Sequence, residues 1–227
     1  MFNQYNLQAR IFPTIICAIP ILLFQYFFLS EEISIFLVFL GNLKFAGDVT
    51  ISIVILYFVS QINRFFSKTF FEKEEIYMPT TDFLLFSNSE YSNEYKVKIY
   101  EKLEKDFGLK LPIEKEQKKN EIYSRKRISE IMSLARNKVG SGKLLLQHNI
   151  EYGFWRNLIG GTIFAVLFSG ITTYFSYTES NKTLFFVSII LLIFYLLILI
   201  FNKFIIGRFG KMYAKVLIQE YMRMKIE

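Results

Sequence analysis

Four long apolar stretches, separated by polar residues, dominate the hydrophobic pattern of the chain. They cover residues 11–29, 46–62, 158–175 and 183–201. Each is close to the roughly 20 residues that a helix needs to cross a hydrocarbon core about 30 Å thick. Because so small a protein cannot bury such runs in a soluble core, the pattern predicts four transmembrane helices.

The composition points the same way. Hydrophobic residues make up 52% of the 227 residues, whereas a soluble domain is about 45–50% apolar. The first stretch is longer than the apolar region of a signal peptide, about 7–15 residues, and the sequence LSEEIS after it has no obvious cleavage site. We therefore expect this stretch to be retained as a membrane helix.

The distribution of lysine and arginine predicts the orientation of the spans. Residues 63–157 contain 18 of these residues and the tail from Asn202 contains 6, whereas the two short loops contain only Lys44 and Lys182. Because basic loops stay on the cytoplasmic side of a membrane, we expect both termini and the central segment to be cytoplasmic.

The predicted fold is an all-α membrane protein with a helical cytoplasmic insert between transmembrane helices 2 and 3. The expected parts are an N-terminal helical pair (1–62), the basic insert (63–157), a second helical pair (158–201) and a cytoplasmic C-terminal helix (202–227). In the tail, Tyr213, Leu217, Tyr221 and Met224 recur at helical spacing.

The first half of the insert carries one clear helix signal. Apolar residues repeat every four positions from Tyr95 to Phe107, and Gly108 provides a C-terminal stop. Residues 76–89 are predicted to be extended, because Pro79 disfavours helix before it. Residues 111–120 are interpreted as a charged connector.

A second amphipathic helix is predicted to begin at Asn120. It either ends near Val139 or continues through Gly140 and Gly142 into the third span. A continuous helix would transmit movement of the insert directly to the membrane, whereas a break at the glycines would form a hinge.

The chain lacks the residues that a metal site or a nucleophilic active site requires. The chain contains one histidine, His148, and one cysteine, Cys17, which lies inside a predicted span. His148 and Glu151 offer two metal ligands at most, and no second motif positions a nucleophile beside the histidine. We expect neither an enzyme, nor a metal site, nor a cofactor.

Basic residues of the insert predict a site for an anionic ligand. On an uninterrupted helix, Lys118, Arg125, Arg136 and Lys143 would lie close to one meridian. A nucleotide or nucleic acid would suit such a strip, although anionic lipid headgroups attract the same residues. The predicted ligand-binding residues are Arg125, Lys126, Arg127, Arg136 and Lys143.

The stretch HNIEYGFWRNLIGG, residues 148–161, lies where the third span should leave the cytosol. Trp155 can lie at headgroup level and Arg156 can reach the interface. The stretch has more hydrogen-bonding groups than anchoring requires, which suggests coupling between insert and membrane helices. The predicted coupling residues are His148, Asn149, Glu151, Tyr152, Trp155, Arg156 and Asn157.

Two groups of residues in the spans fit either a pore or helix packing. Asp48 and Ser52 could form a ring at a pore mouth, or lie in the headgroup region or at a helix cap. Small residues recur every four positions in the third span, where they let helices approach closely or, in an oligomer, line water. These residues are Gly161, Ala165, Ser169 and Thr173.

Three sequence segments follow one another in the chain, framed by two predicted spans on each side: MPTTDFLL, EKLEKDFGLKLP and LLLQHNIEYGFWRNLIGG. With them the chain resembles the membrane effectors of Hailong-type anti-phage systems, small bacterial proteins encoded beside nucleotidyltransferases. The resemblance covers most of the chain. It implies a tetrameric ion channel of the bacterial inner membrane, whose opening kills or arrests an infected cell. It also implies that a DNA-like oligonucleotide from the partner nucleotidyltransferase keeps the channel closed.

The leading functional hypothesis is an oligomeric ion channel gated through its insert by an anionic nucleotide or single-stranded DNA oligomer. The alternative is a non-conducting membrane scaffold that docks a cytoplasmic partner on the same insert. A strict monomer in detergent would favour the scaffold, because one copy with four spans hardly encloses a water-filled path.

Overall fold

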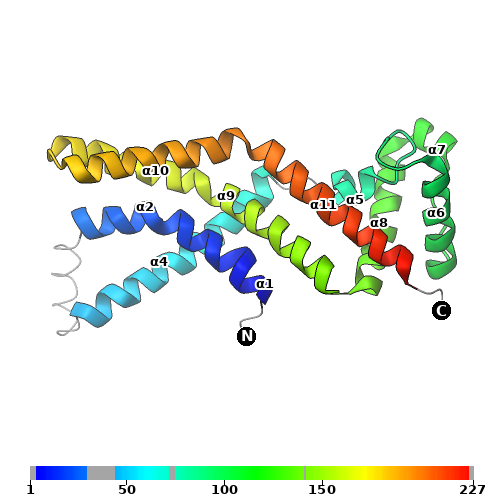
Figure 1. Cartoon of the computed structure of the whole chain (residues 1–227), viewed down its shortest axis with the longest axis horizontal. Coiled ribbons are helices and arrows are strands. Elements are labelled where there is room, and N and C mark those ends of the chain that lie inside the picture. The colour runs from blue at the N-terminus through cyan, green and yellow to red at the C-terminus, as the bar shows by residue number, and fades with distance from the viewer. Residues whose placement is uncertain (1–3, 30–43, 72–74, 141, 225–227) are drawn as a thin grey trace. The chain divides into compact units, whose positions relative to one another are not determined.

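The computed structural model describes residues 4–29, 44–71, 75–140 and 142–224, and this described part is helical without any strand (Figure 1). The first half contains α1 (Gln4–Asn6), the π-helical turn η1 (Leu7–Ile11), α2 (Phe12–Phe28), α4 (Lys44–Phe66), the π-helical turn η2 (Ser67–Phe71), the 3₁₀ turn η3 (Glu75–Tyr77), α5 (Pro79–Asp82) and α6 (Asn93–Phe107). The second half contains α7 (Glu114–Lys119), α8 (Glu121–Val139), α9 (Lys143–Thr178), α10 (Lys182–Ile200) and α11 (Asn202–Arg223).

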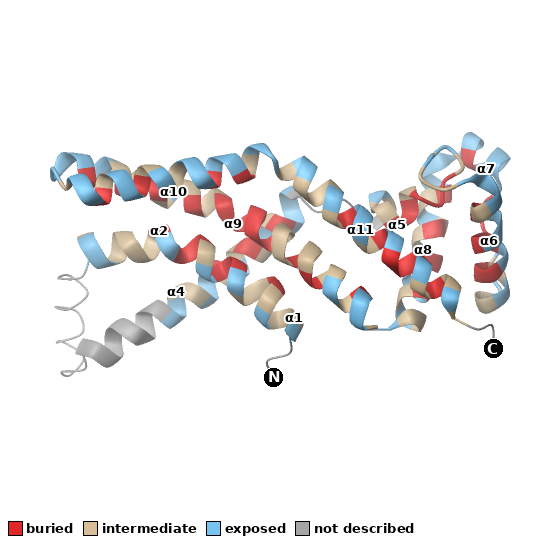
Figure 2. Cartoon of the chain, in the orientation of Figure 1, coloured by how far each residue is buried: buried red, intermediate tan, exposed pale blue. Residues whose placement is uncertain are grey.

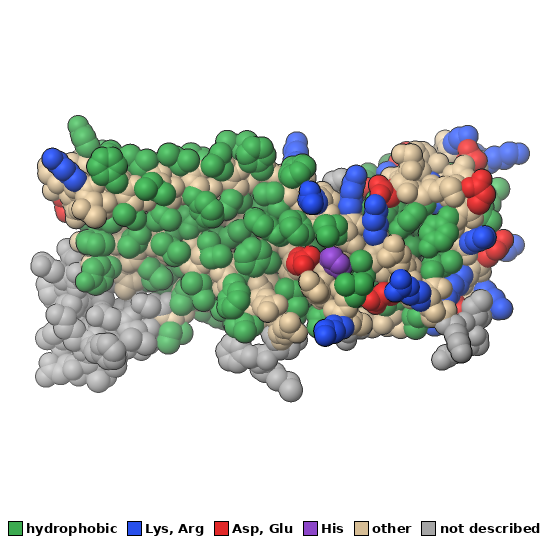
Figure 3. All heavy atoms as spheres, viewed as in Figure 1, with side chains coloured by type: hydrophobic (Ala, Val, Ile, Leu, Met, Phe, Trp, Pro, Cys, Tyr) green, Lys and Arg blue, Asp and Glu red, His purple; other side chains and the backbone are tan. Residues whose placement is uncertain are grey.

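The chain divides into two units. The apolar unit comprises Met1–Glu72 and Gly153–Ile205, and the polar unit comprises Lys73–Tyr152 and Ile206–Glu227. The chain passes from one unit to the other within α9 and within α11. Hydrophobic side chains cover most of the visible surface of the apolar unit, whereas charged side chains gather on the polar unit (Figure 3).

Three helical segments of the described chain are long and apolar enough to cross a membrane, which is consistent with a multi-pass membrane protein. They are Gln4–Phe28, Lys143–Thr178 and Lys182–Ile200. These segments include the predicted spans 11–29, 158–175 and 183–201, except that the first and the third segment each end one residue before the predicted span does. The predicted span 46–62 lies inside α4, which is helical but is not among the three. The four-span topology with a cytoplasmic insert therefore stays a prediction.

Two prolines in the first apolar helix leave backbone carbonyls without their usual donor, because proline has no N–H for the carbonyl four residues earlier. Pro13 affects Ala9, and Pro20 affects Ile16. Other helices provide the missing donors: Asn157 Nδ2 of α9 donates to the Ala9 oxygen at 2.6 Å, and Tyr195 Oη of α10 donates to the Ile16 oxygen at 2.5 Å. These bonds fix the register of α9 and α10 against the first helix.

A pair of glycines lets α9 approach α4 and α2 closely. A Cβ atom at position 160 would lie 2.6 Å from the backbone nitrogen of Ser67 and would also overlap the Asn63 carbonyl oxygen. A Cβ atom at position 161 would lie 2.5 Å from both Cys17 Sγ and Asn63 Oδ1. The glycines that end the stretch HNIEYGFWRNLIGG are thus required by helix packing.

The polar unit is built around the helix that the sequence predicts over residues 92–108. In α6, Ser92 caps the N-terminus by accepting from the Tyr95 backbone N–H, and Gly108 ends the helix with φ +65°. Ile99 and Leu103 of α6 belong to a buried cluster to which α8 and α11 also contribute. The members from those two helices include Ile128, Ile131, Met132, Ala135, Ala214, Leu217 and Tyr221.

Two expectations for the insert are wrong. Residues 76–89 are not simply extended, because Pro79 is the first residue of α5, where a proline needs no N–H partner. Residues 111–120 are not a plain connector, because they contain α7. The Glu116 side chain accepts from the Ile113 N–H at 3.0 Å and stabilises the start of this helix.

A buried carboxylate joins three helices of the polar unit. Tyr221 Oη of α11 donates to Asp106 Oδ2 of α6 at 2.6 Å, and Lys138 Nζ of α8 lies 3.3 Å from the same oxygen. The Asp106 side chain is only 2% exposed. Burial raises the pKa of Asp106, but the hydrogen bonds from Tyr221 and Lys138 and the positive charges of Lys138 and Lys102 outweigh it and hold the pKa below its ordinary value.

We expect Asp106→Asn to destabilise the protein by about 1–3 kcal/mol, because Lys138 and Tyr221 lose a charged acceptor in a buried place. The folded carboxyl binds its proton more weakly than the unfolded one. Its stabilisation is therefore complete above the ordinary pKa of about 4 and is lost as the pH falls through the lower folded value. Thermal unfolding between about pH 3 and pH 7 measures both effects.

Glu114→Gln provides the control. Glu114 pairs with Lys118 at 2.7 Å, but both side chains are largely exposed, so we expect no measurable change in stability. If the two variants lost equal stability, the Asp106 contacts would not hold the three helices together.

Candidate ligand-binding site

The helix that begins after Asn120 ends at Val139, and α9 begins at Lys143. Gly140 adopts φ +69° and ψ −138°, a conformation that strongly favours glycine. A Cβ atom at position 142 would lie 2.6 Å from Glu220 Oε2 of α11. Of the two possibilities left open by the sequence, the structure therefore shows the break.

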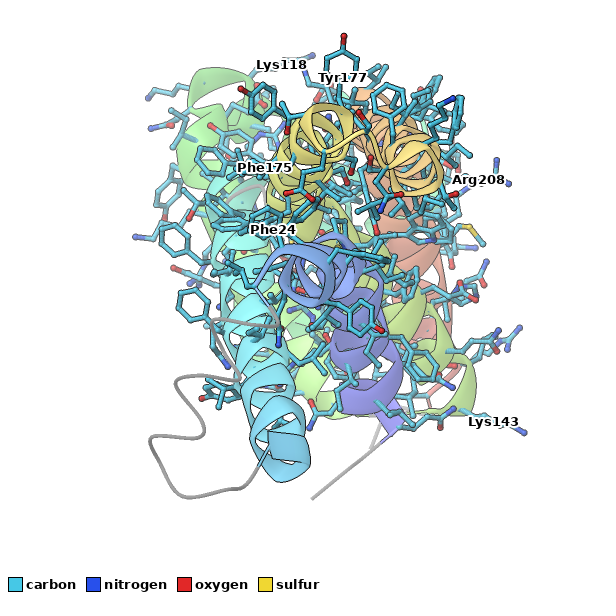
Figure 4. The ribbon with its side chains drawn as sticks, turned by 90° about the vertical axis from the view of Figure 1, so that its left-hand side faces the viewer. Phe24, Lys118, Lys143, Phe175, Tyr177 and Arg208 are labelled. Carbon is cyan, nitrogen blue, oxygen red and sulfur yellow. The ribbon has the colours of Figure 1, made fainter. Side chains whose placement is uncertain are left out.

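The break means that one straight basic strip does not exist. Lys118 belongs to α7, Arg125 and Arg136 to α8, and Lys143 to α9. The four residues were expected to lie along one side of a single continuous helix. The helix is instead interrupted at Asn120 and again at Gly140. In Figure 4, Lys118 and Lys143 project at opposite edges of the view.

Arg125 is already neutralised by its own chain. Its guanidinium pairs with Asp82 of α5 and, at 2.7 Å, with Glu121 one turn earlier in α8. It also donates to the Ile76 carbonyl at 3.3 Å and lies over the Tyr77 ring, 5.1 Å from its centroid. Burial lowers the pKa of Arg125, but the two carboxylates outweigh it and raise the pKa overall. These contacts make Arg125 a link between α5 and α8.

The other predicted basic residues differ in their surroundings. Arg127 lies 3.6 Å from Glu130 and donates to the Lys110 carbonyl at 3.4 Å. Lys126 and Lys143 are exposed. Both lysines remain able to attract an anion.

A pocket of about 360 Å³ lies where the end of α8, the start of α9 and the middle of α11 meet. It is lined by Arg136, Asn137, Gly140, Leu145, Leu146, Asn149 and Tyr213, and we call it the Arg136 pocket. Of the five predicted ligand-binding residues, Arg136 lines it. Of the predicted coupling residues, Asn149 does.

The Arg136 guanidinium stacks loosely on an aromatic ring. Its Cζ atom lies 6.0 Å from the centroid of the Tyr213 ring. Its Nε atom is buried, and no hydrogen-bond acceptor for it exists among the described residues. An unsatisfied buried donor costs about 1–3 kcal/mol. The residue also brings a positive charge to the lining of the pocket.

Tyr213 connects the pocket to the rest of the polar unit. Its ring stacks on Tyr152 of α9 with centroids 6.3 Å apart and an angle of 14°. A Cβ atom at Gly210, one turn earlier in α11, would lie 3.4 Å from Tyr152. Tyr152, a predicted coupling residue, thus packs against the aromatic ring that lines the pocket.

The remaining coupling residues fall in two places. In the polar unit, His148 Nδ1 lies 3.1 Å from Glu151 Oε2, and no group of three metal-binding side chains occurs in the part of the chain that the structure describes. In the apolar unit, Trp155 packs edge-on against Phe154, Arg156 follows in the same helix, and Asn157 bonds the Ala9 carbonyl.

The small residues of the third span lie inside the apolar unit. Gly161, Ala165 and Ser169 are buried, and Thr173 Oγ1 lies 2.9 Å from Ser188 Oγ of α10. Nearby, Phe24 of α2 meets Phe175 of α9 with ring centroids 5.7 Å apart (Figure 4). These contacts pack helices within one copy of the chain.

Asp48 and Ser52 belong to α4, but their side chains lie outside the described residues. The proposed ring at a pore mouth therefore stays a prediction.

Sequence reasoning missed Asn137 and Tyr213 as members of the site. Tyr213 was recognised as part of an amphipathic tail helix, and a basic residue of α8 facing an aromatic residue of α11 is a contact 77 positions apart in the chain. The usable signal was Gly140: a glycine that ends a helix four residues after an arginine places that arginine in the last turn of the helix, next to the junction.

Comparisons of this chain with protein-family models, with curated proteins and with solved structures return no match. The geometry of the Arg136 pocket and the apolar helices therefore carry the functional argument.

Proposed function

We propose that the chain is one subunit of an oligomeric transmembrane ion channel that is controlled by an anionic ligand in the Arg136 pocket. The observation that carries the proposal is the pocket that Arg136 lines together with residues of α9 and α11, two helices that continue into the apolar unit. The expected setting is the inner membrane of a bacterium, with both termini and the polar unit in the cytoplasm.

The pocket favours a ligand with both an anionic and a planar part. A guanidinium binds phosphate or carboxylate through strong charge-assisted hydrogen bonds. The side-chain amides of Asn137 and Asn149 donate and accept hydrogen bonds, and the Tyr213 ring offers a stacking face. A nucleotide or the end of a short DNA oligomer combines these features. Such a ligand is also what the resemblance to nucleotidyltransferase-linked effectors implies.

Control is proposed to pass along α9 and α11. Asn149 contributes to the pocket from the first turns of α9, and the same helix supplies an apolar segment long enough to cross a membrane. Tyr213 contributes from α11, which continues from the apolar unit. The Gly140 break separates α8 from α9, so α8 can shift on ligand binding without unwinding α9.

An ion path is proposed to form between several copies of the chain. One copy with at most four spans hardly encloses water, and the resemblance implies a tetramer. In this account the open channel arrests or kills an infected bacterium, and the ligand comes from an enzyme encoded alongside.

Arg136→Gln and Arg125→Gln form a matched pair that tests the site. Each removes one positive charge from α8, so non-specific attraction of an anion falls equally in both. We expect Arg136→Gln to weaken binding of a fluorescent single-stranded DNA oligomer by about tenfold or more, because it removes a charge-assisted contact. We expect Arg125→Gln to retain binding within about twofold and to lower the thermal unfolding temperature, because Asp82 loses its partner.

Equal losses in both variants would assign the binding to a diffuse basic surface and remove the pocket from the account. A wild-type protein that binds no oligomer would favour the scaffold, whose insert docks a protein partner instead.

A further inference from the structure

Contacts inside the apolar unit bring basic residues of separate helical segments to one level. Asn157 of α9 bonds the Ala9 carbonyl of η1 at 2.6 Å. The next residue of η1 is Arg10. It therefore lies level with the start of the predicted span 158–175, to within about one helical turn.

Two basic residues at the end of α4 and in η2 lie at the same level. The position of Gly160 in α9 is in contact with Asn63 and Ser67, and buried positions of α4 and α9 gather where these helices cross (Figure 2). Arg64 and Lys68 each follow one of these two contact residues directly in the chain. They therefore lie within about one turn of Gly160 along the axis of α9.

Lys203, the second residue of α11, reaches this level from the end of α10. The helices α9 and α10 run in opposite directions (Figure 1), and Thr173 Oγ1 lies 2.9 Å from Ser188 Oγ. Lys203 comes 15 residues after Ser188, and Leu158 comes 15 residues before Thr173. Because both helices rise equally per residue, Lys203 is level with Leu158 to within about one turn.

We call Arg10, Arg64, Lys68 and Lys203 the basic belt of the apolar unit. Lys68 and Lys203 are exposed, and Arg10 and Arg64 are partly exposed. No aspartate or glutamate lies within three residues of any of them in the sequence. The belt therefore concentrates positive charge at one level of a mostly apolar surface.

The belt lies one hydrocarbon thickness from exposed tyrosines at the other end of the unit. From Leu158 to Tyr177, α9 rises about 30 Å, which is the thickness of a hydrocarbon core. Tyr26, Tyr174 and Tyr177 are 70%, 64% and 71% exposed, and tyrosine is enriched at membrane–water interfaces. With these tyrosines at one interface, the belt lies at the headgroups of the opposite leaflet.

Exposed aromatic rings adjoin the belt. Phe65 follows Arg64 and is 63% exposed, and Phe204 follows Lys203 and is 67% exposed. A cation beside an exposed apolar ring matches an anionic phospholipid, which joins a charged phosphate to acyl chains. A soluble anion would use the cations alone. The combination of charge, apolar rings and depth therefore favours lipid as the occupant of the belt.

We propose that the basic belt binds the phosphate groups of anionic phospholipids in one leaflet, expected to be the cytoplasmic one. The lipid phosphates contact the guanidinium and ammonium groups, and the acyl chains lie against the neighbouring phenylalanines. Basic residues beside an anionic leaflet attract its lipids strongly. This inference goes beyond the proposed channel function, because it concerns the lipid that surrounds each subunit and holds for a scaffold as well.

The test places a single tryptophan at the belt and another at the opposite interface. Phe204→Trp and Tyr26→Trp are made separately in a Trp155→Phe background, which removes the only native tryptophan. The two positions have nearly equal exposure, 67% and 70%. Each protein is placed in vesicles of equal parts phosphatidylcholine and phosphatidylglycerol. The acyl chains of either the first or the second lipid are brominated, because bromine quenches tryptophan fluorescence on close contact.

We expect brominated phosphatidylglycerol to quench the tryptophan at position 204 about threefold or more better than brominated phosphatidylcholine. At position 26 the two lipids should quench about equally. Adding Lys203→Gln to Phe204→Trp should remove most of the preference. Equal quenching at position 204, or a preference that Lys203→Gln leaves intact, would overturn the proposal. No quenching there by either lipid would contradict the depth of the belt and overturn it too.

Discussion

Gly160→Ala is expected to destabilise the apolar unit by about 1–3 kcal/mol or more, although alanine normally stabilises a helix relative to glycine by about 1 kcal/mol. The added Cβ atom would lie 2.6 Å from the Ser67 backbone nitrogen and 2.8 Å from Ser67 Cβ. Backbone atoms cannot move aside as a flexible side chain can, so α4 and α9 must separate. Thermal unfolding of the protein in detergent measures the effect.

Gly170→Ala is the matched control for this change. Gly170 lies in the same helix, but a Cβ atom there would meet nothing within 4 Å. We expect the stability of this variant to equal or slightly exceed that of the wild type, as helix propensity alone dictates. Indistinguishable unfolding temperatures for the two variants would mean that α9 does not approach α4 at the glycine pair.

The second large effect concerns the carbonyl that Pro20 leaves unpaired. Tyr195→Phe removes the hydroxyl that donates to the Ile16 oxygen at 2.5 Å and should cost about 1–3 kcal/mol, because a buried acceptor loses its partner. The cost depends on the proline. In a Pro20→Ala background the alanine N–H can donate to Ile16, so Tyr195→Phe should then be nearly neutral.

A double-mutant cycle isolates this dependence. We expect a coupling energy of about 1 kcal/mol or more between positions 20 and 195, measured as thermal or denaturant stability of four proteins in the same detergent. A cycle with zero coupling would show that the Tyr195 hydroxyl does not replace the donor that Pro20 removes. Asn157 and Pro13 form a second such pair through Ala9 and allow the test to be repeated.

Local signals explain the parts of the fold that the sequence predicted. The helix over residues 92–108 has a four-residue apolar repeat, a serine cap and a glycine stop within the segment itself, and the structure has α6 there. Runs of apolar residues likewise predicted the three helices that are long enough to span a membrane. The short helices α5 and α7 were missed, because helices of four and six residues have too few positions to show a period.

Long-range contacts explain what sequence reasoning could not find at the site. Arg125 was predicted to bind a ligand, but it pairs with Asp82. The two residues are 43 positions apart, and no sequence pattern links residues at that distance. The prolines of the first span were visible, whereas the partners of the carbonyls they free lie 148 and 179 residues away. The surplus polarity noticed at Asn157 is used for such a bond.

Ion flux through liposomes that contain the purified, oriented protein tests the central claim most directly. The flux is measured with and without a short single-stranded DNA oligomer, for the wild type, Arg136→Gln and Arg125→Gln. The account predicts a flux that the oligomer changes in the wild type and in Arg125→Gln but leaves unaltered in Arg136→Gln. No flux in any condition would contradict the account and identify the chain as a non-conducting scaffold.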